Sequence, residues 1–96
     1  MNAVRDMAHV HEEWLPGSDG MKIFVRSWQP VQAPRAIVAI VPGFKSHSGH
    51  YQWTGEHLAA QGFAVHAVDL RGRGKSDGER FYIDRIEGYL SDIRLL

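Results

Sequence analysis

The most apolar stretch of the chain runs from Ala36 to Val41, without a polar side chain and with mostly β-branched residues. Pro34 before it and Pro42-Gly43 after it limit the run to the length of a strand. Such a run is typical of a central strand that is buried on both faces of a parallel sheet. The loop from Gly43 to His50 then begins at the carboxyl end of this strand, where ligands bind in open α/β sheets.

Two strands joined by a tight turn are predicted before this run. Residues 11–15 form a short candidate strand, and residues 16–20 are rich in residue types that reverse the chain. From residue 21 to about Trp28, apolar positions alternate with other residues, which is the period of a strand with one buried face. The inward positions are Met21, Ile23 and Val25. Strands so closely connected favour an antiparallel hairpin.

Helices and strands alternate in the second half of the chain. Residues 51–61 have the spacing of a helix that ends at Gly62. Residues 63–69 form a second apolar strand, so residues 36–69 predict a strand, helix, strand unit with parallel strands. The final segment predicts a helix, with Asp84 as N-cap and Glu87 as its partner. Its apolar residues at helical spacing are Tyr82, Ile86, Tyr89, Leu90 and Ile93.

The final helix carries no stop signal, because its apolar stripe continues to Leu96. The predicted sheet is also small for an open α/β domain, which normally carries helices on both faces. We therefore expect residues 1–96 to be the N-terminal part of one larger α/β domain. The remainder of that domain is then the main partner of the chain.

Composition narrows the class of protein. The 96 residues are 44% hydrophobic, with 11 basic and 11 acidic side chains, which is typical of a globular protein and gives no support for a nucleic-acid partner. There is no cysteine, which excludes disulfides and thiolate metal sites. Residues 1–10 lack the apolar core of a signal peptide, and no run approaches the about 18 residues of a transmembrane span. We expect a cytoplasmic protein, with peripheral membrane association left open.

Four sequence blocks together are similar to the monoacylglycerol lipase and lysophospholipase group of α/β-hydrolases, of the serine aminopeptidase S33 type. The blocks are residues 20–28, 41–44, 46–51 and 69–78. The resemblance implies an α/β-hydrolase fold and a serine hydrolase that cleaves carboxylic esters such as monoacylglycerol or lysophospholipid, without a cofactor. It also implies that nucleophile, acid, base and lid lie beyond Leu96, so the 96 residues alone are expected to be inactive.

The resemblance assigns an oxyanion-hole role to the loop after residue 41. It places one donor on the backbone N–H of Phe44, and Gly43 lets the substrate approach the backbone. His47 is a candidate for ordering the loop or contacting the substrate. From the local residues alone, Pro42-Gly43 is equally well explained as a turn that ends a strand.

Four positions depart from the family pattern. Pro42 stands where the family usually has His, which removes a supporting side chain but leaves the Phe44 donor in place. Lys45-Ser46 replaces the commoner Gly-Glu, and Arg73 stands where the second loop usually carries His. These departures leave the substrate preference open.

Several other motifs are rejected. Residues 74–78 match the Gly-x-Ser-x-Gly pattern of a nucleophile elbow, but they lie several residues beyond the strand end at Asp69 and no helix follows at once. Ser76 is therefore rejected as a nucleophile, and Asp69, Ser76 and Asp77 are expected to order the loop. Asp69 and Asp77 also occupy positions where a P-loop and a dinucleotide fingerprint require glycine. The histidine pairs lack the spacing of zinc sites, so no metal is expected.

Two alternatives to the enzyme stay open. A non-catalytic α/β-hydrolase-like binding domain would lack a downstream catalytic triad. A small interaction protein of 96 residues would unfold cooperatively by itself. A nucleophile elbow followed by Asp and His beyond Leu96 would favour the enzyme.

Overall fold

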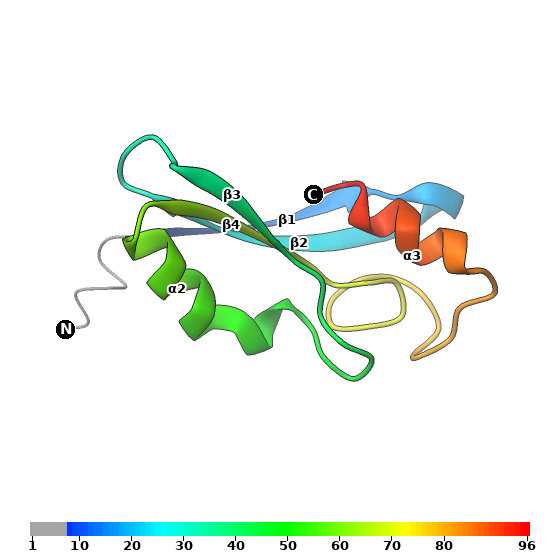
Figure 1. The fold of residues 1–96 in the computed structure, drawn as a ribbon. Helices are drawn as coiled ribbons and strands as arrows, with labels where there is room; N and C mark the ends of the chain where they lie inside the picture. The colour runs from blue at the N-terminus through cyan, green and yellow to red at the C-terminus, as the bar shows by residue number, and fades with distance from the viewer. Residues whose placement is uncertain (1–7) are drawn as a thin grey trace.

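The computed structural model describes residues 8–96, which form a mixed sheet with helices on both sides (Figure 1). The four strands lie in the order β1-β2-β4-β3. β1 (Ala8–Pro16) and β2 (Lys22–Pro30) form an antiparallel hairpin. β3 (Ala36–Ile40) pairs in parallel with β4 (Phe63–Val68), whose other edge pairs antiparallel with β2. The predicted hairpin and parallel strand pair are therefore confirmed.

In the described part of the chain, four helical segments connect and cover these strands. The 3-10 helix η1 (Ser18–Gly20) closes the hairpin, and η2 (Ser48–Tyr51) leads into α2 (Gln52–Ala60). α3 (Ile86–Ile93) follows the long loop after β4. Figure 1 shows α2 and α3 on opposite sides of the sheet. Within residues 8–96, no helix combines the length and the hydropathy needed to cross a membrane.

Two apolar clusters fill the space between the sheet and the helices. One contains Ile23, Val25, Val68 and Leu70, and residues of α3 pack against it. The other contains Trp28, Ala59, Val65 and Ala67 beneath α2. Alternate residues of β2 and β4 point to opposite faces, so each strand contributes to both clusters.

The prediction that β2 buries only one face is wrong. Phe24 is fully buried, although it lies on the face opposite Ile23 and Val25. Its ring packs edge-on against Trp14 with a centroid distance of 4.9 Å, and Lys75 lies over it at 5.1 Å. The loop after β4 thus covers the second face of β2, a contact that the local period could not reveal.

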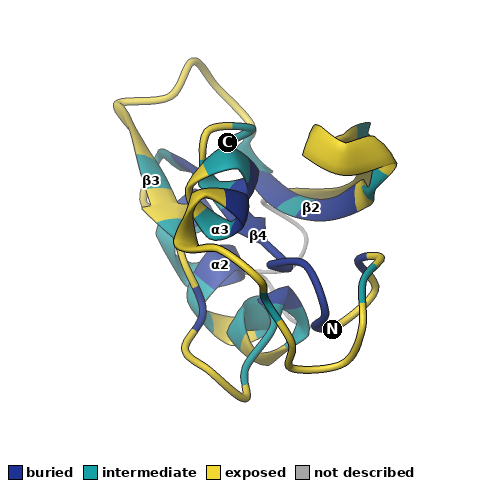
Figure 2. Ribbon diagram, turned by 90° about the vertical axis from the view of Figure 1, so that its right-hand side faces the viewer, coloured by how far each residue is buried: buried dark blue, intermediate teal, exposed yellow. Residues whose placement is uncertain are grey.

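The prediction that β3 is a central strand buried on both faces is also wrong for the described residues. β3 is an edge strand, because β4 pairs with β3 on one edge and with β2 on the other. Ile37 is 71% exposed, and Figure 2 shows β3 as an exposed and half-buried ribbon beside the buried β4. An apolar run indicates that a strand is suited to burial. It does not indicate which of the described segments cover that strand.

Two details of the termini also differ from expectation. The cap predicted at Asp84 and Glu87 is wrong, because Arg85 is the N-cap of α3 and makes no side-chain capping bond. In the predicted stripe, Ile86 and Leu90 are exposed, whereas Tyr89 packs on the core. At the other end, the first ten residues show no clear period and were expected to fray or to extend the first strand. Residues 8–10 do extend β1, and residues 1–7 lie outside the described residues.

Gly55→Ala is expected to destabilise the protein by about 1–3 kcal/mol, because overpacking forces a packed core to shift. Gly55 lies inside α2, and a Cβ atom there would come closer than 3.0 Å to the indole of Trp28. The midpoint of urea unfolding measures the effect. Gly43→Ala is the matched control for stability, since nothing lies within 4 Å of its Cβ position. Equal stability of the two variants would contradict the packing of α2 on Trp28.

Candidate functional site

The loops that follow β3 and β4 lie together at the carboxyl edge of the parallel strands (Figure 1). Asp69, which is buried, joins them. Its Oδ1 accepts a hydrogen bond from Ser48 N at 2.6 Å, and its Oδ2 accepts one from Lys75 N at 2.9 Å. A Cβ atom on Gly74 would come closer than 3.0 Å to Asp69 and to His47, so only glycine fits between the two loops. The loop-ordering role predicted for Asp69 is confirmed.

In the peptide group between Gly43 and Phe44, the carbonyl oxygen is hydrogen-bonded and the N–H is free within the described residues. The Gly43 carbonyl oxygen accepts hydrogen bonds from Ser46 N at 3.0 Å and from Arg73 Nη1 at 3.3 Å. Among the described residues, no group accepts a hydrogen bond from the Phe44 amide. Phe44 is 59% exposed, and the Cβ position of Gly43 faces open space. The site therefore offers an unused backbone donor with room beside it.

Arg73 is the charged side chain that donates a hydrogen bond to this peptide group. Although only 5% exposed, it forms no ion pair within residues 8–96, and its Nε has no partner there. Its guanidinium lies 4.6 Å from the ring centroid of Phe44 and 5.0 Å from that of Tyr89. Nη2 also donates to the Tyr89 hydroxyl at 2.6 Å. From the sequence, Arg73 was noted only as a departure from the family pattern, because its side chain contacts two segments that are distant in sequence, the loop after β3 and α3.

His47 lies in the same loop and starts η2. Its Nδ1 accepts a hydrogen bond from Gly49 N at 3.1 Å, which leaves Nε2 to carry the proton in the neutral ring. Its ring lies 4.1 Å from that of His50, whose Nδ1 is 2.9 Å from Ser46 Oγ. These bonds give His47 a role in ordering the loop. Contact between His47 and a substrate stays a prediction.

Ser76 and Asp77 attach the second loop to β2. Ser76 is 2% exposed, and its Oγ accepts from Phe24 N at 2.7 Å and donates to the Asp69 carbonyl. Asp77 binds Lys22 twice, through its amide and through Oδ2, each at 2.9 Å. With its hydroxyl fully engaged and no helix after it, Ser76 has the structural role that was predicted.

Ser76→Ala should therefore lower stability but leave the nucleophile untouched. The change leaves the buried Phe24 amide without its acceptor, which costs about 1–3 kcal/mol. In the full-length protein, labelling by a serine-directed fluorophosphonate should persist at temperatures where the variant is folded. Loss of labelling in folded protein would make Ser76 the nucleophile.

A buried ion pair fixes α3 against the loop and was missed by the sequence analysis. Arg71 and Asp92 are both buried, and Arg71 Nη2 lies 2.9 Å from Asp92 Oδ1. Arg71 N also donates to Asp92 Oδ2 at 2.8 Å, and Nη1 reaches Asp19 at 3.2 Å. The hydrogen bond to Asp92 is the main cause that raises the pKa of Arg71 above its ordinary value. An available signal was the position of Asp92 in the helix, three residues after Tyr89 and one before Ile93, both of which pack on the core.

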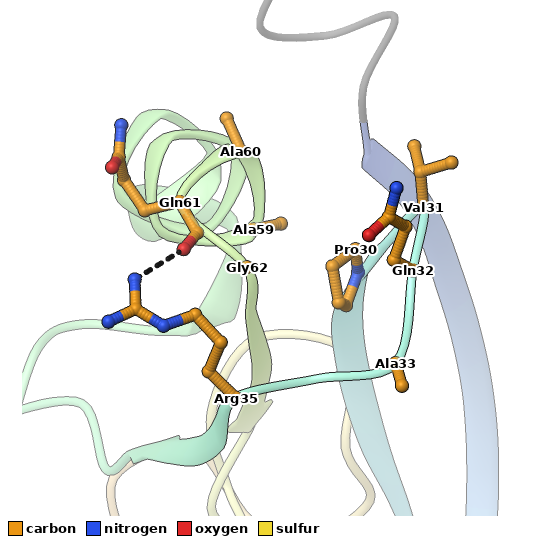
Figure 3. Close-up of a pocket in the computed structure, with 9 residues that line it drawn as sticks. All are labelled: Pro30, Val31, Gln32, Ala33, Arg35, Ala59, Ala60, Gln61 and Gly62. Atoms are coloured by element: carbon orange, nitrogen blue, oxygen red, sulfur yellow. Dashed lines mark hydrogen bonds between the residues drawn. The ribbon is translucent and has the colours of Figure 1, made fainter.

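A cavity of about 260 Å³ lies away from these loops, at the amino ends of β3 and β4 (Figure 3). The turn after β2 and the end of α2 line it, and Arg35 Nη1 donates to the Gln61 carbonyl at 3.2 Å across its rim. None of the predicted site residues contributes to it. Within the described range, no three metal-ligating side chains gather in one place.

Comparisons with known proteins identify relatives of this chain. The family model described as serine aminopeptidase, S33, matches residues 32–96. The monoacylglycerol lipase of Mycolicibacterium smegmatis is 32% identical over 85 residues, which cover 88% of this chain and 30% of that protein. The human monoglyceride lipase is 32% identical over 79 residues, covering 82% of this chain and 26% of the lipase. The chain thus spans less than a third of either relative.

A solved structure has a similar fold over part of its length. The thermostable carboxyl esterase from Bacillus coagulans, crystallised with glycerol, aligns with a TM-score of 0.63 and 31% identity. The alignment covers 69% of this chain and 22% of the esterase.

Proposed function

Since the chain belongs to the serine aminopeptidase S33 family of α/β-hydrolases, we propose that it forms the N-terminal part of a serine hydrolase. The substrates are carboxylic esters such as monoacylglycerols or lysophospholipids. The names of the relatives support this choice, because the M. smegmatis and human proteins are monoacylglycerol lipases and the B. coagulans protein is a carboxyl esterase.

The observation that carries the proposal is the free amide of Phe44. It lies in the loop after a parallel strand and belongs to an exposed residue, and it donates to no described group. In this fold one oxyanion donor comes from this loop, and the other follows the nucleophile. The open space beside Gly43 admits the substrate carbonyl to this amide.

The chain's part in the reaction is electrostatic. When a serine hydroxyl attacks an ester carbonyl, its proton passes to a His base and negative charge develops on the carbonyl oxygen. The Phe44 N–H donates to that oxygen and stabilises it more than the neutral carbonyl of the bound ester. Nucleophile, acid and base come from the part of the domain that follows Leu96. The proposed reaction needs no cofactor. The cytoplasmic location of the protein stays a prediction.

The test uses the full-length protein that contains this chain. We expect labelling by a fluorophosphonate probe and hydrolysis of p-nitrophenyl butyrate, monoacylglycerol or lysophosphatidylcholine. The ratio of kcat/KM for the two lipids identifies the preferred head group. A folded full-length protein that is neither labelled nor active on any of the three esters would overturn the proposal and favour a non-catalytic binding domain.

A further inference from the structure

Two arginines in the loop after β4 have opposite surroundings. Arg71 is paired with the buried carboxylate of Asp92. Arg73 is equally buried, yet no carboxylate faces it among residues 8–96, and its Nε is unpartnered there. Burying an unpaired cation costs free energy, so ordinary packing does not explain why a guanidinium occupies this position. Its direct polar contacts are the Gly43 carbonyl and the Tyr89 hydroxyl.

The contact with Gly43 acts on the proposed donor through a single peptide plane. The Gly43 carbonyl and the Phe44 N–H belong to the same peptide group, which is planar and trans, so they point in opposite directions. A bond from Arg73 Nη1 at 3.3 Å and one from Ser46 N at 3.0 Å hold the carbonyl end. Fixing the carbonyl therefore fixes the direction of the N–H.

The same contact also strengthens the donor. A positive charge bonded to a peptide oxygen draws electron density from the nitrogen, and hydrogen bonds in a chain polarise one another. Backbone hydrogen bonds keep Arg73 in place, because its N–H donates to the Leu70 carbonyl and its carbonyl accepts from Ser76 N, each at 3.0 Å. The rings of Phe44 and Tyr89 enclose the guanidinium and limit the water that would weaken its field.

We propose that Arg73 is a positioning residue that holds and polarises the Gly43–Phe44 peptide group, so that the Phe44 amide stays directed at the ester carbonyl oxygen. This inference rests on the proposed function. It adds that the proposed hydrolase activity depends on Arg73. Arg73 acts through the peptide group and has no contact of its own with the reacting atoms.

The test compares three variants of the full-length enzyme. Arg73→Met removes the charge and the donors, Arg73→Lys keeps the charge, and Arg80→Met is the control. Arg80 lies in the same loop and donates to the carbonyls of Gly74, Ser76 and Gly78, but it has no contact with Gly43. For p-nitrophenyl butyrate, we expect Arg73→Met to lower kcat about tenfold or more with KM changed less than about twofold. Arg73→Lys should recover part of kcat, and Arg80→Met should keep it.

Selective ¹⁵N-phenylalanine labelling gives a second measurement that does not depend on activity. The Phe44→Leu variant of the full-length protein lacks the Phe44 signal, so comparison with the parent spectrum assigns that signal. We expect this signal to move upfield in Arg73→Met and to stay in place in Arg80→Met. An inactive full-length protein in which the signal still moves would overturn the proposed reaction and leave the Arg73 contact standing.

Two results would overturn the inference. One is a folded Arg73→Met enzyme with parental kcat and an unshifted Phe44 amide. The other is a loss confined to thermal stability, with kcat unchanged at temperatures where the variant is folded. If Arg73→Met does not fold, the Tyr89→Phe variant tests the inference instead. This variant removes the hydroxyl that accepts a hydrogen bond from Arg73 Nη2 and keeps the aromatic ring. We expect it to lower kcat about two- to fivefold, and an unchanged kcat contradicts the inference.

Discussion

Replacing Phe44 by proline is expected to lower kcat of the full-length enzyme by about 100-fold or more, with a much smaller change in KM. Proline has no N–H, so the substitution removes the proposed oxyanion donor. The fold loses no internal hydrogen bond among the described residues, because this amide donates to none of them. Steady-state hydrolysis of p-nitrophenyl butyrate measures the effect.

Phe44→Leu is the matched control, because it keeps the amide and removes the ring. The ring lies 4.6 Å from the guanidinium of Arg73 and 5.6 Å from the ring of Phe81. Loss of these contacts should change kcat by no more than about fivefold. If Phe44→Pro folds and turns over at the parental rate, the oxyanion donor lies elsewhere.

Asp92→Ala is expected to lower the free energy of unfolding by about 3–5 kcal/mol, because it removes the buried carboxylate of Arg71 and leaves only the exposed Asp19 as its acidic partner. Both side chains are almost fully removed from solvent, so water does not replace the lost partner. The ion pair also ties α3 to the loop after β4, and its loss should loosen both. Urea unfolding of the full-length protein measures the change, provided that a single transition is observed.

Two further variants separate this ion pair from general effects at α3. Asp84→Ala removes the carboxylate that was predicted as the N-cap but makes no cap, and it should cost no more than about 0.5 kcal/mol. Arg71→Met combined with Asp92→Leu should be more stable than Asp92→Ala, because no unpaired charge is then buried. A loss below about 1 kcal/mol in Asp92→Ala would mean that the pair behaves like an exposed one.

The main helices and strands and two of the three strand pairings were predictable, because they depend on periodicity and turn chemistry that lie within short windows. The hairpin, the α2 helix that stops before Gly62, and the parallel pair of β3 and β4 are confirmed. The fold class, the N-terminal part of an α/β-hydrolase fold, is confirmed as well. Gly55, an unfavourable residue inside a helix, is explained by its packing against Trp28.

What was missed depends on segments distant in sequence. The burial of Phe24 depends on Trp14 and on the loop that contains Lys75. The edge position of β3 depends on the strand order, which an apolar run does not encode. The site shows the same limit: resemblance pointed to Gly43 and Phe44, but the contact from Arg73 required the two loops to be brought together.

The most direct measurement is the crystal structure of the full-length enzyme after reaction with a fluorophosphonate. The phosphonyl oxygen then stands in for the carbonyl oxygen of the ester when it carries negative charge. We expect this oxygen to lie about 2.7–3.1 Å from the backbone nitrogen of Phe44. A phosphonyl oxygen that is bound only by other donors, with the Phe44 amide directed away from it, would contradict the account.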